Sequence, residues 1–382
     1  MPIVEAAARF GYTSQDNFTT AFRAYFSLTP GELQGMERKY RNLSLNMKEP
    51  LNIMELSNLK QSDLCSTMMS CIKGANDYFD LDWSLPKLYG YSTHAFMVNV
   101  HKDLCPSSPY VWNHDRFYLA LRNMGMRRSG TVMLEKYSPA ALKTQTELRI
   151  KEHLDAGKVC IMDFLEHQLI AGYDDGGFLL LKPWNCSSPV ELPSLSFASF
   201  SEALERKDEG WVGFTFLEKE DLRSDEESLL RDALAAILKM RSDPGSFAMP
   251  GYACGDAGWE AWLQAVDKGL GTGHGHWWTG MVWSECRNMA GEFFKEAGAG
   301  FGSEPECRTG AERGNGAGFG NGERKRLCAA LAEVSFACAA QLKRASDKAA
   351  PKEVQLAALA ECRRLDLSRD ELAGSLLKAL AG

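Results

Sequence analysis

The sequence predicts an α+β fold in which a short helical segment, a module of mixed helices and strands, and a larger helical domain follow one another. Three observations predict it. Phenylalanines recur every four residues at Phe18, Phe22 and Phe26, which is typical of one face of a helix. Apolar runs between residues 159 and 182 flank the turn sequence Asp-Asp-Gly-Gly, which indicates a β-hairpin. Apolar residues with helical spacing dominate after residue 224.

The composition is that of a globular chain. Its 382 residues exceed one ordinary core, so two or three domains are expected. A net charge of −7 excludes a protein that binds nucleic acid with its whole surface, so any DNA contact must be local. The 11 cysteines form no metal-type pairs, and the first residues lack the pattern of a secretory signal. We therefore expect a cytoplasmic protein with reduced thiols, no membrane partner and no cofactor.

The pattern of elements divides the chain into four segments. They are a helical segment at 1–40, a polar linker at 41–53, a mixed module at 54–222, and a helical domain at 223–382 with a glycine-rich loop at 298–322. Helices are predicted at 66–78, 142–156, 229–240, 259–266, 277–294 and 327–342, and strands at 159–164, 167–173, 178–182 and 211–217. Ser224 with Glu227, and Ser368 with Glu371, fit the capping box that begins a helix.

The first segment has the pattern of a helix-turn-helix. A helix over residues 4–10 ends at Gly11, which suits a tight turn, and Thr13 or Ser14 is placed to cap a second helix. The phenylalanine stripe of that helix is expected to face inward, which leaves a polar face free to enter the major groove of DNA. The residues on that face are Ser14, Gln15, Asp16, Asn17, Thr19, Thr20 and Arg23.

This stretch resembles the second half of the DNA-binding domain of AraC/XylS-family transcriptional regulators. Over about a tenth of the chain, the match runs in order through Ile3, Ala7, Gly11, Tyr12, Ser14, the three phenylalanines, Thr29 and Pro30. Ser27 stands where the family usually has glycine, and Gln34 where it often has arginine. The resemblance implies a transcriptional regulator. Because the family uses two helix pairs and only the second is matched, we expect weak DNA binding by this chain.

Cys65 and His167 are the candidate catalytic pair of the middle module. Cys65 stands at a predicted helix start, where the helix dipole favours a thiolate, and His167 is a candidate base on a strand. Gln61 is placed to donate to an oxyanion. The order Gln…Cys, then His-Gln-Leu-Ile-Ala-Gly-Tyr-Asp, resembles papain-like peptidases of the bacteriocin-processing type. That resemblance implies an orienting aspartate where Lys182 stands, and Asn185 is a candidate substitute.

A looser resemblance concerns a possible ligand site. The stretch from Asp63 through Tyr-Ser-Thr-His-Ala-Phe is similar to butirosin-biosynthesis-H-type domains, which share the papain-like ancestry and handle acyl or amine ligands. The surplus of tryptophan in the helical domain predicts that this domain closes the cleft of the middle module over a small organic ligand. The candidate ligand-binding residues are His94, Tyr252, Trp259, Trp262 and Trp283.

Two functions of different classes remain open at this point. The favoured one is a DNA-binding transcriptional regulator whose ligand-sensing module is a degenerate cysteine-peptidase-like fold, with Cys65 beside His167 and no carboxylate behind the imidazole. The alternative is a thiol hydrolase or acyltransferase that uses Cys65 and His167 and carries a vestigial DNA-binding segment. A binding protein with neither activity is a third interpretation. No metal site is expected, because His274 and His276 lack a third ligand. The sequence leaves the ligand and the oligomeric state open.

Overall fold

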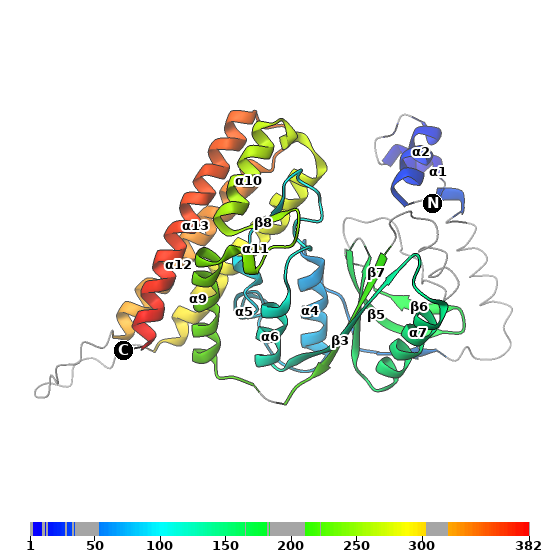
Figure 1. Cartoon of the computed structure of the whole chain (residues 1–382), viewed down its shortest axis with the longest axis horizontal. Helices are drawn as coiled ribbons and strands as arrows, with labels where there is room; N and C mark the ends of the chain where they lie inside the picture. Colours follow the sequence, from blue (N-terminus) through cyan, green and yellow to red (C-terminus); the bar gives the residue numbers. More distant parts are fainter. Residues whose placement is uncertain are drawn as a thin grey trace, which may run out of the picture.

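The computed structural model describes residues 3–9, 12, 14–26, 29–32, 34, 53–164, 166–181, 183, 211–221, 223–302 and 320–381. An antiparallel sheet and a group of long C-terminal helices make up most of it, which confirms the α+β class (Figure 1). At the N-terminal end, α1 (Ile3–Arg9) and α2 (Gln15–Phe26) lie where two helices were predicted. None of the helices within these ranges has an apolar stretch long enough to cross a membrane.

Within the described residues, the main sheet has six strands and all its pairings are antiparallel. Its order is β1 (Met54–Glu55), β5 (Glu166–Asp174), β4 (Val159–Phe164), β7 (Trp211–Lys219) and β3 (Met126–Glu135), with β6 (Gly177–Leu180) paired to β5. The four predicted strands and the β5–β6 hairpin are confirmed. The β3 strand was missed because its sequence lacks clean alternation and a bulge between Arg128 and Gly130 breaks its register.

Helices lie against this sheet (Figure 1). The α4 helix (Thr67–Tyr78) packs on β5, and α7 (Ala140–Asp155) packs on β4 and its neighbours. Ser66, where the helix was predicted to begin, caps α4 by accepting the Met69 N–H. The predicted stop of α7 is also found, since Gly157 follows it with a φ of +67°, which glycine adopts without strain.

The middle module and the helical domain share one hydrophobic core. That core runs from Leu56 to Leu380 without a break at residues 222–223, where a domain boundary was expected. A second, small sheet also joins the two segments, because β2 (Asn99–His101) pairs with β8 (Tyr252–Cys254). The short helices of the middle module are α5 (Leu85–Tyr91), η1 (His94–Phe96) and α6 (Asp115–Asn123). The helical domain therefore packs directly on the module.

Apolar periodicity predicted four of the described C-terminal helices, namely α9 (Glu226–Ser242), α10 (Gly255–Asp267), α11 (His274–Gly300) and α12 (Asn321–Ala345). It did not predict α13 (Lys352–Ala381), for which the sequence indicated only a capping box at Ser368. The short turns η2 (Pro244–Ser246) and η3 (Leu270–Thr272) lie between α9 and α11. Figure 1 shows α11, α12 and α13 running alongside one another, and each of these neighbours is in close contact.

Three details of these helices differ from the sequence prediction. Asp225 rather than Ser224 caps α9, because its carboxylate accepts the Ser228 N–H at 2.9 Å. Ser368 begins no helix, since it lies inside the 30-residue α13. The expected glycine-rich loop begins later than predicted, because residues 298–300 still belong to α11. Residues 303–319 of that loop lie outside the described residues.

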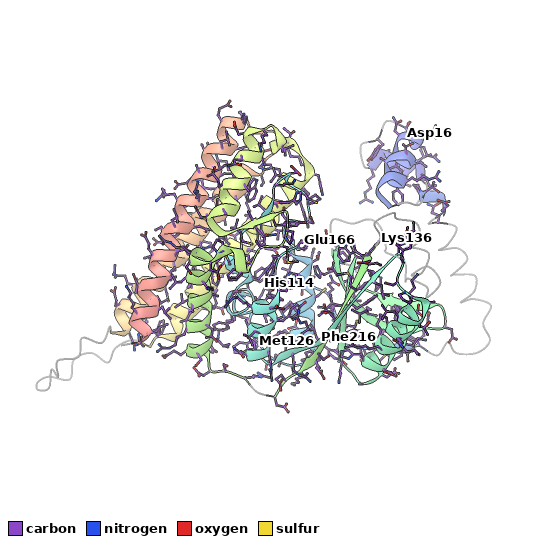
Figure 2. The ribbon with its side chains drawn as sticks, viewed as in Figure 1. Asp16, His114, Met126, Lys136, Glu166 and Phe216 are labelled. Atoms are coloured by element: carbon purple, nitrogen blue, oxygen red, sulfur yellow. The ribbon has the colours of Figure 1, made fainter. Side chains whose placement is uncertain are left out.

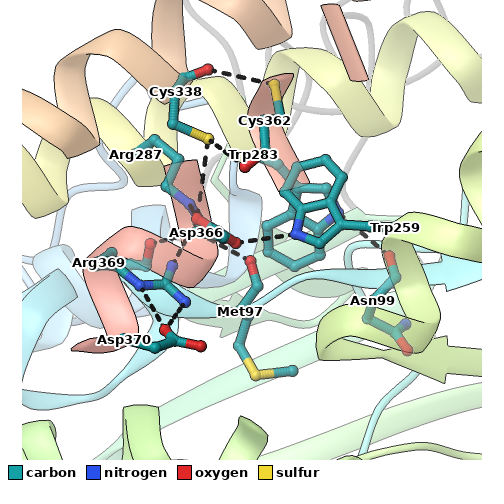
Figure 3. Close-up of polar contacts among 11 residues, drawn as sticks. Met97, Asn99, Trp259, Trp283, Arg287, Cys338, Cys362, Asp366, Arg369 and Asp370 are labelled. Carbon is teal, nitrogen blue, oxygen red and sulfur yellow. Dashed lines mark hydrogen bonds and ion pairs between the residues drawn. The ribbon is translucent and has the colours of Figure 1, made fainter. Parts of the chain in front are cut away.

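Arg287 of α11 joins three elements inside the core (Figure 3). Its side chain is fully buried and donates to both oxygens of Asp366 on α13, at 3.0 and 2.6 Å. The same guanidinium donates to the carbonyl oxygens of Ala95 and Met97 at η1. Burial acts to raise the pKa of Asp366, but the guanidinium groups of Arg287 and Arg369 outweigh it and lower that pKa. The carboxylate is therefore ionised and fully paired.

Replacing Arg287 by methionine is expected to destabilise the chain by about 3–5 kcal/mol, because Asp366 loses its main partner inside the core. Urea unfolding followed by circular dichroism measures this loss. Arg364→Gln is the matched control, since Arg364 pairs with Glu361 on the exposed face of the same α13. That control is expected to change stability by less than about 1 kcal/mol. A similar loss in both variants would contradict the anchoring role of Arg287.

Candidate functional site

The N-terminal helix pair has a small core of its own. Ala7 of α1 is buried together with Phe18 and Phe22 of α2. Ser14 caps α2, because its hydroxyl accepts the Asn17 N–H at 3.1 Å. The predicted cap and inward-facing stripe are thus present at these positions. The side chain of Phe26, and residues Gly11, Thr13 and Ser27, lie outside the described residues.

The polar side chains of α2 and its cap are accessible. Of the residues predicted to contact DNA, Thr19 is half-buried and the others are exposed, namely Ser14, Gln15, Asp16, Asn17, Thr20 and Arg23. Asp16 lies in the first turn and Arg23 in the last, where each charge complements the helix dipole. The pair therefore has an apolar side that is buried and a polar side that is mostly exposed.

Cys65 lies just before α4 and faces a carboxylate from α11. Its backbone N–H donates to Oε2 of Glu285 at 2.7 Å, and the Ser66 N–H donates to Oε1 at 2.9 Å. The Tyr89 hydroxyl donates to the same carboxylate at 2.6 Å. Burial, the charge of Glu285 and its hydrogen bond with the thiol raise the pKa of Cys65 to about 12. A thiol with so high a pKa is not an activated nucleophile.

Gln61 is not available as an oxyanion donor. Its amide N–H donates to the His167 carbonyl oxygen at 2.9 Å, and its amide oxygen accepts the Leu169 N–H at 2.9 Å. The side chain is buried, and both of its polar atoms are bonded to the backbone of β5. The predicted catalytic role of Gln61 therefore has no support in its geometry.

His167 faces an aspartate, which corrects the expectation that no carboxylate lies behind it. Its Nε2 lies 3.7 Å from Oδ2 of Asp163, and the two residues are direct partners in the β4–β5 register. The peptidase resemblance implied an orienting aspartate at the position of Lys182, with Asn185 as a candidate substitute. Both residues lie outside the described residues. The hairpin register was the signal that could have found Asp163, because a tight β4–β5 turn places the residues at i and i+4 opposite each other.

The charged groups with the largest influence on the pKa of the Cys65 thiol are Glu285, Asp63 and Lys343, and His167 is not one of them. The imidazole next to the start of α4 belongs to His94 instead, whose Nε2 lies 2.9 Å from the Ser66 hydroxyl. His94 is fully buried, and Trp112 stacks on its ring. Burial, with His167 and Arg287 nearby, lowers the pKa of His94 to about 3, so its ring is neutral near pH 7.

His94 belongs to a cluster of three imidazoles with His167, which is also buried, and His114, which is half-buried. Burial, with His167 and His94 nearby, lowers the pKa of His114 to about 3, and His167 also acts to lower the pKa of His94. One ring nitrogen of each is buried without a hydrogen-bond partner among the described residues: Nδ1 of His94, Nε2 of His114 and Nδ1 of His167. Spacing along the chain could not reveal this cluster, because η1, the residue before α6, and β5 each supply one ring.

Glu166 lies beside this cluster at the start of β5, and sequence analysis missed it. Figure 2 labels Glu166 and His114, which both lie in the region between the helices around α4 and the sheet. The hydroxyls of Thr67 and Tyr110 donate to Oε2 of Glu166 at 2.7 and 2.6 Å. Burial raises the pKa of Glu166 to about 7, although these two hydrogen bonds act to lower it. Its carboxyl therefore titrates near neutral pH.

The tryptophans predicted to line a ligand pocket lie in the core instead. Trp259, Trp262 and Trp283 are at most 1% exposed, and each indole N–H has a partner within the fold. Those partners are Asp366, His276 and the Asn99 carbonyl oxygen. Tyr252 is half-buried and shares a hydrogen bond with Ser107. The helical domain does pack on the module, as expected. These three indoles, however, are buried in the packing between them and do not line a ligand pocket.

His276 also has a structural role. Its Nδ1 accepts the Trp262 N–H at 2.9 Å, and its Nε2 lies 2.7 Å from the Ala345 carbonyl oxygen, so both ring nitrogens are used.

In the part of the chain that the structure describes, no group of three histidine, cysteine or acidic side chains is arranged to hold a metal ion.

No protein-family model and no curated protein matches this chain. The three family resemblances therefore remain expectations. The function is inferred from the geometry of the helix pair and of the α4 region.

Replacing Glu166 by glutamine is expected to change how stability depends on pH. The carboxyl has a pKa of about 7 when folded and near 4.5 when unfolded, so the folded chain binds the extra proton between these values. Raising the pH from 4.5 to about 7 therefore destabilises the wild-type chain, because the carboxyl ionises in the unfolded state before it does so in the folded state, and above pH 7 the loss stays constant. The variant has no carboxyl at this position and is spared the loss. From pH 4.5 to 8, the variant should gain up to about 3 kcal/mol relative to wild type, measured by urea unfolding.

The control for this prediction is Glu152→Gln, which changes an exposed glutamate of α7. It should run parallel to wild type across the same pH range. A Glu166→Gln curve that also runs parallel to wild type would show that Glu166 does not titrate in this window.

Proposed function

We propose that this chain is a DNA-binding transcriptional regulator with a ligand-sensing module. The observation that carries the proposal is the α1–α2 pair, in which Phe18 and Phe22 are buried while the polar side of a capped helix is exposed. An exposed polar helix held by a second helix is the geometry that helix-turn-helix proteins insert into the major groove. The overall charge of −7 agrees with a DNA contact confined to this end of the chain.

We also propose that the sensing module is a degenerate papain-like fold. Support comes from α4, which begins next to Cys65 and packs on an antiparallel sheet that carries His167. Thiol chemistry is not favoured. The Cys65 pKa is raised, the backbone N–H groups at α4 are occupied by Glu285, and the Gln61 amide is bonded to β5. The alternative of a thiol hydrolase or acyltransferase therefore finds no support in this arrangement.

The DNA-binding role predicts that Gln15→Ala and Arg23→Ala weaken binding to a specific duplex. Each is expected to lose about 1–3 kcal/mol if its side chain reads a base edge. Because the operator is unknown, the chain is first used to select duplexes from a random-sequence pool, and gel-shift titrations with the selected duplex then compare the variants.

Arg364→Gln serves as the charge-matched control, because it removes one positive charge from an exposed site on α13. It should leave the affinity unchanged. Selection that enriches no sequence, or equal affinities for the wild-type chain and both α2 variants, would sink the assignment of α2 as the recognition helix.

A further inference from the structure

The β3 strand lies at one edge of the main sheet, because β7 is its only strand partner among the described residues (Figure 1). It is ten residues long, whereas β1, at the other end of the strand order, has two residues. Thr131, Met133 and Glu135 are exposed, Met133 by 55%. A long strand at a sheet edge presents a row of backbone groups that can pair with another chain.

The direction of the backbone groups along β3 is set at its last residue. The Glu135 N–H donates to the Ser138 hydroxyl at 2.9 Å, and the Glu135 carbonyl oxygen accepts the Ser138 N–H at 3.0 Å, so these groups point away from β7. Alternate residues of an antiparallel strand point their N–H and C=O groups to opposite sides. Thr131 and Met133 therefore also point theirs away from β7. No described residue bonds to the N–H or C=O groups of these two residues.

The open stretch lacks the features that usually protect an edge strand. Such edges are commonly guarded by charged side chains, by proline or by a bulge. Residues 130–134 read Gly-Thr-Val-Met-Leu, without charge or proline, and the bulge lies before them, between Arg128 and Gly130.

An exposed tryptophan extends this edge onto the face of the sheet. Trp211 is 39% exposed, and it is the register partner of Glu135. Its Cζ3 lies 3.8 Å from the position that a Cβ on Gly213 would take, and Gly213 is the register partner of Met133. Met133 and Trp211 therefore lie on the same face and form an exposed apolar patch next to the open edge.

The open stretch of β3 can pair with a second copy of itself. When two copies run antiparallel about a two-fold axis at Val132, Thr131 of each copy lies opposite Met133 of the other. Both residues point their backbone groups outward, so the two Thr131–Met133 pairs exchange four backbone hydrogen bonds. The strand is thus self-complementary, as an interface with two-fold symmetry requires.

The charges at the two ends of β3 also suit this pairing. Arg127 and Arg128 lie near its start, and Glu135 lies at its end. Antiparallel pairing brings the start of one strand to the end of the other, so Glu135 of each copy approaches the arginines of the other copy. No described residue pairs with the Glu135 carboxylate. The neighbouring Lys136 lies over the Tyr137 ring.

From this edge we propose that β3 is a homodimer interface, at which a second copy of this chain adds its own β3 and extends the sheet across a two-fold axis. A second copy fits better than an unrelated strand, because β3 supplies both the outward backbone pairs and the opposite charges. The inference goes beyond the proposed DNA binding and does not rest on it. The link between the two is stoichiometric, since a dimer has two α1–α2 pairs and makes more phosphate contacts than one chain.

The test is sedimentation velocity of the full chain over a range of concentrations, with wild type compared with Met133→Lys and Thr131→Pro. The lysine places a charge where the second strand must lie, so the dimer dissociation constant should rise by roughly tenfold or more. The proline removes an outward N–H that β7 does not use, so it should also weaken the dimer and leave the monomer folded.

The matched control is Leu148→Lys, which makes the same kind of change at a residue of α7 that is 54% exposed. It should leave the dissociation constant unchanged. Circular dichroism melting checks that the β3 variants and the control are folded alike.

A cross-linking experiment tests the register itself. Across the two-fold axis Val132 faces its own copy as a non-hydrogen-bonded pair, for which the Cα separation is about 4.5 Å and within the range of a disulfide. Oxidation of Val132→Cys by diamide should therefore give two peptides linked at position 132, detected by non-reducing mass spectrometry. Adding Met133→Lys should suppress this link, and Leu148→Cys should form no such link.

A chain that remains monomeric at every concentration overturns the proposal. So does a dimer that Met133→Lys and Thr131→Pro leave intact, because it must then use another surface. If β3 pairs with a strand of a different protein while the chain alone is monomeric, the edge has another occupant and the homodimer is wrong. These measurements contain no DNA, so failure of operator binding leaves their outcome unchanged, and a monomer that binds its operator removes the dimer alone.

Discussion

The buried ion pair between Arg287 and Asp366 is the constraint that the rest of the fold depends on. An ionised group inside a core is tolerated only with a partner, and this guanidinium has one carboxylate and two backbone carbonyl oxygens as partners. Because those partners come from α13 and from η1, none of the three elements can shift alone without leaving a charge or a carbonyl group unpaired. The helical domain and the middle module are thus locked into a single core, and the place of α11 over α4 follows from that lock.

The position of α11 then decides the chemistry at α4. Glu285 lies two residues before Arg287, and the fixed helix delivers its carboxylate to the N–H groups of Cys65 and Ser66. Donors that would stabilise a developing negative charge in an enzyme are instead paired with this carboxylate, and burial together with Glu285 raises the pKa of the neighbouring thiol. The same packing buries His94, so its ring stays neutral. The arrangement thus does not favour nucleophilic attack by the thiol.

Polar groups remain in the interior where the module meets its helices. Glu166 accepts hydrogen bonds from two hydroxyls, and among the described residues three imidazoles each have one buried nitrogen without a hydrogen-bond partner. The contact between α4 and β5 is therefore a polar part of the interior. Burial raises the pKa of Glu166 to about 7 and lowers the pKa values of His94 and His114 to about 3. The Arg287–Asp366 pair, in contrast, stays ionised near neutral pH.

Local patterns in the sequence determined the elements whose physics is local. The start of α4 near Ser66, the stop at Gly157, the Asp-Gly turn before β6 and the phenylalanine stripe of α2 were all predicted, because each depends on residues within one or two turns. The site depends on distant pairs instead. Glu285 reaches Cys65 across 220 residues and Asp366 reaches Arg287 across 79, and no spacing rule links such positions. Only the packed core brings these side chains together, and burial there decides their protonation.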